Sequence, residues 1–121
     1  MTHTVVTAAN APYFPLLQGL VRSLTAEGAA PSPIHVLDVG LTDAQRGWCA
    51  ELGVGVVSTH AHPETTRRRE DRALTLVPKL HIPEYVSGFD ILVWLDADTW
   101  VQHPGCVRAL ADTAADGALA I

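Results

Sequence analysis

The segment Ile91–Val101, ILVWLDADTWV, predicts a buried strand that ends in two carboxylates. Its apolar residues run directly into Asp96-Ala97-Asp98, and in an extended chain the two aspartates project to the same side. Like charges held this close repel each other, and a divalent cation relieves that conflict. Oxygen ligands favour Mg or Mn, which usually share their coordination shell with substrate phosphates. Ala97 is small enough to let a ligand approach, although a bare D-x-D can equally be a solvated strand end or helix cap.

The bulk composition indicates a single globular domain. The chain has 121 residues, of which 48% are hydrophobic, and a net charge of −5, which excludes a broad basic surface for nucleic acid or anionic membrane. No apolar run approaches the ~18 residues of a membrane span, and the N-terminus lacks the layout of a secretory signal. We therefore expect a soluble, cytoplasmic protein with no membrane span, in which Cys49 and Cys106 are reduced and buried.

Strand-like and helix-like patterns alternate along the chain. Strands are expected at Thr4–Ala8, Ile34–Val39, Val54–Ser58 and Ile91–Leu95. Helices are expected from about Phe14 to Gly28, from the Thr42/Gln45 capping box to Gly53 with Trp48, Cys49 and Leu52, around Leu74–Val86, and after Pro104. This alternation predicts an α/β fold, with a mostly parallel sheet flanked by helices in a Rossmann-like arrangement.

Parallel sheets bind ligands beyond the carboxyl ends of their strands. Asn10 and Asp96–Asp98 each follow a predicted strand, so both are expected at that edge. Ala118–Ile121 resembles the start of a further strand, and we therefore expect the chain to be the first part of a larger domain.

With these motifs in order, the chain resembles the nucleotide-sugar glycosyltransferases of the GT-A fold. It resembles in particular glycosyltransferase family 8, which includes glycogenin and bacterial lipopolysaccharide galactosyltransferases. The segments that carry the resemblance, in sequence order, are VVTAANAPYFPLLQGLVRSL, IHVLDVGLTDAQR, TLVPKLHIPEY and ILVWLDADTWV. They are similar to the family's opening strand with its nucleotide turn and first helix, its second strand, a segment with a basic residue, and its D-x-D strand.

The resemblance implies a donor-binding set of residues: Ala8, Ala9, Asn10, Tyr13, Lys79, Asp96, Ala97 and Asp98. It implies that Asp98 binds the metal directly and that Asp96 shares metal and nucleoside contacts. Asn10 and Tyr13 match positions at the uracil and ribose pocket, and Lys79 matches a basic residue near the phosphates or sugar. Ala8 and Ala9 match positions that contribute mainly backbone.

The resemblance also implies an activity: metal-dependent transfer of a sugar from a nucleotide sugar, expected to be UDP-linked, to an unknown acceptor with retention of configuration. Mn or Mg, together with Lys79, would stabilise the leaving diphosphate. Residues 1–121 would be the N-terminal donor-binding part of one GT-A domain. The family's third metal ligand, a histidine, and its acceptor pocket lie in the second half, which is expected to be absent, and this puts catalysis by the chain alone in doubt. The sugar, the acceptor, Mn against Mg and the oligomeric state stay open.

Three alternatives remain beside the transferase. A haloacid-dehalogenase-type phosphatase also ends a strand in D-x-D, but its threonine stands two residues beyond the second aspartate, whereas Thr99 follows Asp98 at once. A non-catalytic or truncated nucleotide-binding remnant would share the same residues. A related nucleotidyltransferase usually carries a glycine-rich and basic opening loop, and AANAPY is neither.

Several further residues are of types that bind metals or phosphates, but the neighbouring sequence does not favour such a role. His60 and His62 lack a partner carboxylate or cysteine at ligand spacing, and Arg67–Arg69 are followed at once by acidic residues, so both are expected to be solvated. His103 stands five residues after Asp98, whereas the family's histidine lies far downstream. Trp94 and Trp100 are expected to be packing residues, and Tyr13 can equally be a core aromatic of the first helix.

Overall fold

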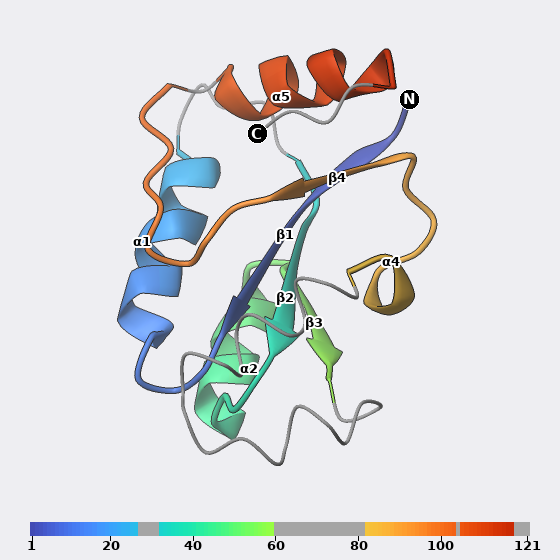
Figure 1. Cartoon of the computed structure of the whole chain (residues 1–121). Helices are drawn as coiled ribbons and strands as arrows, with labels where there is room; N and C mark the ends of the chain where they lie inside the picture. Colours follow the sequence, from blue (N-terminus) through green and yellow to red (C-terminus); the bar gives the residue numbers. More distant parts are fainter. Residues whose placement is uncertain (27–31, 60–81, 104, 118–121) are drawn as a thin grey trace.

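The computed structural model describes residues 1–26, 32–59, 82–103 and 105–117. Its strands are β1 (His3–Ala9), β2 (Ile34–Asp38), β3 (Gly55–Ser58) and β4 (Ile91–Trp94). Its helices are α1 (Phe14–Leu24), α2 (Asp43–Glu51), α4 (Ile82–Tyr85) and α5 (Cys106–Ala115). Strands and helices alternate as the sequence predicts (Figure 1).

The described strands form one parallel sheet in the order β3-β2-β1-β4. Strand β1 lies in the interior of the sheet, paired with β2 on one side and β4 on the other. This position explains its sequence, because a strand covered on both faces has no solvent side and needs no polar alternation. Every residue from Thr4 to Ala9 is buried. The predicted α/β class with a parallel sheet is confirmed.

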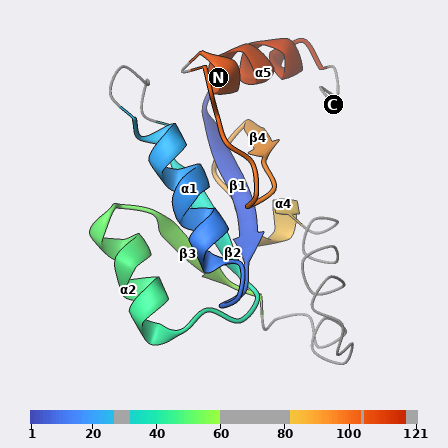
Figure 2. The same ribbon diagram turned by 90° about the vertical axis from the view of Figure 1, so that its left-hand side faces the viewer.

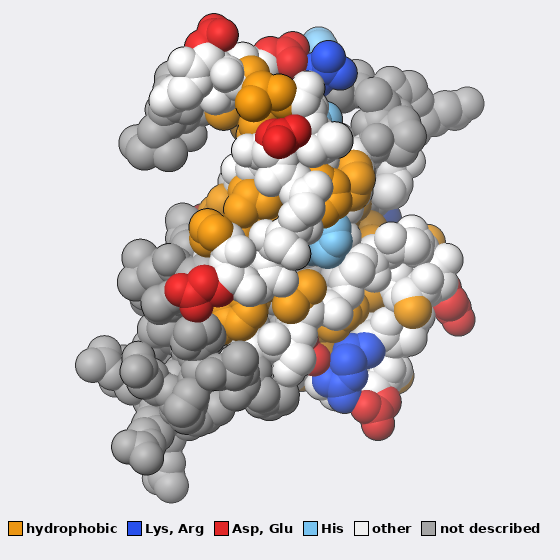
Figure 3. Space-filling view, turned by 90° about the vertical axis from the view of Figure 1, so that its right-hand side faces the viewer, with side chains coloured by type: hydrophobic (Ala, Val, Ile, Leu, Met, Phe, Trp, Pro, Cys, Tyr) orange, Lys and Arg blue, Asp and Glu red, His pale blue; other side chains and the backbone are white. Residues whose placement is uncertain are grey.

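Helices cover the sheet on both faces, as Figure 2 shows most clearly. The larger core lies between the sheet and α1, α2 and α5, and the smaller core lies on the α4 side. Figure 3 shows the molecule from the α4 side, where hydrophobic side chains gather across the middle of the surface. The smaller core contains Val6, Ala8, Leu37, Ile82 and Val86, with Val57, Tyr85, Phe89, Leu92 and Trp94 packed at its border.

The first two helices follow from their sequences. The expected three- and four-residue spacing in α1 buries Phe14, Leu17, Val21 and Leu24 against the sheet. Helix α2 begins with the predicted capping box: Gln45 N donates to the Thr42 hydroxyl at 3.2 Å, and Thr42 N donates to Gln45 Oε1 at 3.0 Å.

Other features differ from the sequence-based expectations. Leu52, expected within the second helix, is the C-cap residue of α2 and is 50% exposed. Cys106 was expected to be buried, but it is exposed at the first position of α5, whereas Cys49 is buried and both are free thiols. The predicted helix at Leu74–Val86 lies largely outside the described residues, which contain only its end as α4, and Ala118–Ile121 lies outside them too.

In the described part of the chain, no helix combines the length and the apolar character needed to span a membrane.

Two threonines of β1 are fully buried, but only one has its hydroxyl satisfied. Thr4 Oγ1 donates to Pro33 O at 2.8 Å and lies 2.8 Å from His35 Nδ1. Because Thr4 donates its only hydroxyl hydrogen to Pro33 O, the hydrogen bond to His35 requires a proton on Nδ1. We therefore assign the His35 tautomer in which Nδ1–H donates to Thr4 Oγ1. Thr7 Oγ1 has no hydrogen-bond partner within the described ranges. An unpaired buried hydroxyl carries a desolvation cost that nothing offsets.

We predict that Thr7→Val stabilises the protein by about 1 to 2 kcal/mol, because it removes this unpaired hydroxyl without opening a cavity. The measurement is the free energy of unfolding in urea. Thr4→Val is the matched control: it should destabilise the protein, because it leaves the Nδ1–H of His35 without its acceptor. Destabilisation by Thr7→Val would contradict the account.

His35 makes stability depend on pH. Burial lowers the pKa of His35 below its usual 6.5. Its ring packs edge-on against Phe89 with centroids 5.4 Å apart, and Gly55 leaves room for it, since a Cβ there would lie 2.9 Å from His35 Cδ2. The folded protein therefore favours the neutral imidazole. The stability that this gives is fully present above the unfolded-state pKa and is lost as pH falls below it towards the folded-state pKa.

We predict that the wild-type protein loses more stability than His35→Asn between about pH 7.5 and about pH 5.5. Asparagine retains an amide donor for the Thr4 hydroxyl but does not titrate in this range. Urea midpoints at both pH values, for both proteins, provide the comparison. An equal loss in the two would show that His35 contributes nothing to the acid sensitivity.

Candidate functional site

The strand order creates a switch point between β1 and β4. From β1 the chain proceeds to β2 and β3 on one side of the sheet, and β4 is added on the other side. In open parallel sheets, ligands bind in the crevice outside the carboxyl ends of the strands at such a point. The residues that follow β1 and β4 are Asn10 and Leu95, the latter leading into Asp96–Asp98. The fold thus brings the two predicted loops to adjacent strand ends.

The register brings the D-x-D segment level with the end of β1. Trp94 pairs with Val6, and Leu95 N donates to Val6 O at 3.1 Å. In a parallel strand, successive residues direct their N–H and C=O groups to opposite neighbouring strands. Ala8 therefore directs its N–H and C=O groups to the β4 side, as Val6 does, but at a level where β4 has already ended. Ala9 faces the other way, and its carbonyl accepts Val39 N at 3.2 Å. Of the two alanines, Ala8 therefore offers its backbone towards the D-x-D side.

Asn10 organises the loop between β1 and α1. It is 5% exposed, and its Oδ1 accepts the Tyr13 N–H at 3.1 Å. The carboxamide orientation is assigned from this bond, because the backbone N–H requires an oxygen acceptor. The same assignment leaves Asn10 Nδ2 as a donor, and this nitrogen bonds to none of the described residues. Tyr13 is the half-buried N-cap residue of α1 and packs at the border of the larger core.

The D-x-D residues lie in a turn rather than in the strand. Strand β4 ends at Trp94, and Thr99 N donates to Asp96 O at 2.9 Å, which closes a turn over Asp96–Thr99. The extended geometry expected for Asp96 and Asp98 is therefore wrong. An alternation in exposure remains, because both aspartates are exposed whereas Ala97 between them is 8% exposed. Trp94 Nε1 donates to Asp96 Oδ1 at 2.7 Å and fixes one of the two carboxylates.

These carboxylates are chemically suited to a divalent cation. They provide hard oxygen ligands, and Asp98 makes no hydrogen bond or ion pair with any described residue. The Asp98 carboxylate has no described protein partner, which is expected of a metal ligand before the ion binds. Across the described ranges, no group of three or more His, Cys, Asp and Glu side chains gathers. Asp96 and Asp98 would thus hold the ion from one side, and its other ligands would come from elsewhere, as is common for Mg at substrate phosphates.

Other sequence candidates have different positions. Lys79, His60, His62 and Arg67–Arg69 lie outside the described residues. His103 is exposed, and its Nδ1 accepts Gly105 N at 3.2 Å in the turn before α5. Trp100, expected to be a packing residue, has its ring over Gly19 of α1 but is 62% exposed.

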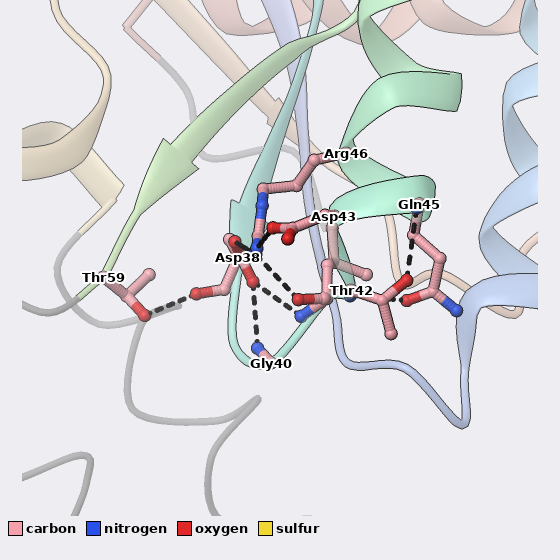
Figure 4. Close-up of polar contacts among 8 residues, drawn as sticks. Asp38, Gly40, Thr42, Asp43, Gln45, Arg46 and Thr59 are labelled. Atoms are coloured by element: carbon pink, nitrogen blue, oxygen red, sulfur yellow. Dashed lines mark hydrogen bonds and ion pairs between the residues drawn. The ribbon is translucent and has the colours of Figure 1, made fainter.

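Asp38 and Arg46 lie at the same edge of the sheet, and sequence reasoning did not select them. Asp38 ends β2, and Arg46 in α2 donates to its Oδ2 at 2.8 Å (Figure 4). A signal was present: an aspartate at a predicted strand end, followed by Val-Gly, is typical of a side chain that accepts hydrogen bonds from the next turn.

No protein-family model matches the chain, and no curated protein matches it. Two solved structures match, both of the galactosyltransferase LgtC: one in complex with donor and acceptor sugar analogues, and one of an active-site mutant. In each case the TM-score is 0.64, the sequence identity is 24%, and the match covers 78% of this chain and 37% of LgtC. The chain thus corresponds to little more than a third of LgtC. The resemblance to a glycosyltransferase fold of the GT-A type is confirmed, as a likeness of fold.

Proposed function

We propose that this chain is the donor-binding part of a metal-dependent glycosyltransferase that uses a nucleotide sugar, with UDP as the nucleotide. The observation that carries the proposal is the placement of two loops at adjacent strand ends, at the switch point of the sheet. One loop, Asn10–Tyr13, offers an amide donor and an aromatic ring. The other, Asp96–Thr99, offers two exposed carboxylates. A base and a diphosphate require these two chemistries side by side.

The first loop suits a pyrimidine nucleoside. Asn10 Nδ2 can donate to a carbonyl oxygen of uracil, while its Oδ1 stays bonded to Tyr13 N and keeps the loop in place. The Tyr13 ring provides a flat face for the base or ribose. The backbone of Ala8 is directed to the β4 side, so its peptide groups are proposed to contribute to the donor site.

The second loop suits the diphosphate. Asp98, with Asp96 beside it, would hold Mn or Mg. A bound cation supplies Lewis-acid stabilisation of the negative charge that develops on the leaving diphosphate. Lys79 is proposed as a second positive charge for that group. The acceptor hydroxyl would attack the anomeric carbon as the bond to the diphosphate breaks, and its proton would pass to the leaving diphosphate. The family resemblance supports retention of configuration.

The comparison of folds favours this function over a phosphatase. The matching structures are of the galactosyltransferase LgtC, one of them in complex with donor and acceptor sugar analogues. A non-catalytic nucleotide-binding role would use the same two loops and would differ only in the absence of transfer. Residues 1–121 are proposed as one part of a GT-A domain, because LgtC is longer than the region matched.

We predict that UDP binds the wild-type chain about tenfold or more tightly with Mn than with a chelator, and that Asp98→Ala abolishes this difference. Isothermal titration calorimetry of UDP under both conditions measures it. Asp98 is exposed and makes no described contact, so the variant should keep the wild-type midpoint of thermal unfolding.

Asp116→Ala is the matched control. It removes the same charge from the exposed C-cap residue of α5, which belongs to neither of the two loops. This control should bind UDP as the wild type does. Metal-dependent binding that persists in Asp98→Ala would remove the metal role of Asp98, and a wild-type chain that binds no UDP would contradict the nucleotide site.

A further inference from the structure

The carboxylate of Asp38 fixes the turn that follows β2. Its Oδ1 accepts the Gly40 N–H at 3.0 Å and the Leu41 N–H at 2.7 Å, and its Oδ2 accepts Arg46 Nη1 at 2.8 Å (Figure 4). Arg46 Nη1 also donates to Leu41 O at 2.7 Å, so the guanidinium holds both ends of the turn. The Asp38 side chain is 11% exposed, and both of its oxygens are engaged.

Asp38 remains ionised in this environment. Burial by itself would raise the pKa of Asp38, but the hydrogen bonds from Leu41 and Gly40 and the adjacent Arg46 guanidinium outweigh it, and the net pKa is lowered. The backbone carbonyl of Asp38 is held as well, because Thr59 Oγ1 from the end of β3 donates to it at 2.8 Å. The end of β2 is therefore rigid at both its main chain and its side chain.

This turn is in contact with the loop that carries Asn10. Ala11 N donates to Gly40 O at 2.9 Å, and Gln45 Nε2 reaches Ala11 O at 3.4 Å. Gly40 has φ +129°, a backbone conformation that favours glycine, and a Cβ there would lie 3.6 Å from Asn10 Cβ. Both peptide groups of Ala11 are thus bonded to the segment that Asp38 and Arg46 stabilise.

We propose that Asp38 is a positioning residue of the nucleotide site. It fixes the turn at Gly40, and this turn holds the Asn10–Tyr13 loop in the conformation that receives the base. The inference rests on the proposed function. Asp38 acts through the loop and does not touch the nucleotide, because its side chain is nearly buried and its oxygens are occupied.

The test is Asp38→Asn, which keeps the size of the side chain and removes its charge. UDP should bind this variant about tenfold more weakly than the wild type, the equivalent of one charge-assisted hydrogen bond. Uridine, which has no phosphates, should weaken by the same factor. The ratio of UDP affinities with Mn and with chelator should not change, because Asp96 and Asp98 are intact.

Asp43→Asn is the matched control. Asp43 is the other carboxylate paired with Arg46, but its side chain is 99% exposed and it bonds to no part of the turn. This control should bind UDP and uridine as the wild type does. Wild-type affinity in Asp38→Asn, or an equal loss in both variants, would overturn the proposal.

Amide hydrogen exchange separates this proposal from the proposed function. In Asp38→Asn, exchange at Ala11 should accelerate relative to Val36 inside β2, whereas a general loss of stability would accelerate both. A wild-type chain that binds no UDP would contradict the proposed function. The exchange rate at Ala11 would then still test whether Asp38 positions the loop: no acceleration in Asp38→Asn would overturn that role. If Asp38→Asn does not fold, Arg46→Gln replaces it: a smaller loss of uridine affinity is expected, and no loss would overturn the proposal.

Discussion

The pairing of β1 with β2 on one side and β4 on the other is the constraint on which the rest of the structure depends. Each strand hydrogen-bonds through alternate peptide groups, so this double pairing fixes the register of both neighbours against β1. It leaves β1 in the interior of the sheet, where every residue from Thr4 to Ala9 is buried, and it places the ends of β1 and β4 next to each other. The Asn10–Tyr13 and Asp96–Thr99 loops, far apart in sequence, therefore lie at the same edge of the sheet.

The two loops are stabilised in different ways. The Asn10 side chain is buried, and its loop is hydrogen-bonded within itself and to the turn after β2, which a charged aspartate and arginine hold in place. Both aspartates of the D-x-D turn are exposed, and the hydrogen bonds of this turn include one from the Trp94 indole and one within its own backbone. A loop held by hydrogen bonds suits a base, whose own hydrogen bonds depend on direction. Exposed carboxylates suit an ion that arrives with its own water and phosphate ligands.

Much of this arrangement follows from local sequence. The apolar runs locate the strands, the Phe14–Leu24 spacing predicts the buried face of α1, and Thr42 with Gln45 predicts the start of α2. The role of Asp38 could not be predicted in this way, because it depends on the contact between Ala11 and Gly40, which only the pairing of β1 with β2 creates. The exposure of Cys106 and Trp100 was missed for a related reason: hydrophobic character does not reveal whether a neighbour is present to cover the side chain.

The measurement that tests the central claim most directly is amide chemical-shift mapping of the isotope-labelled chain during titration with UDP and Mg. If both loops form one nucleotide site, the shifts should concentrate at Asn10–Tyr13 and Asp96–Thr99, with smaller changes at Gly40 and little change in α5. Shifts restricted to one loop, or centred on α5, would contradict a shared site at the ends of β1 and β4.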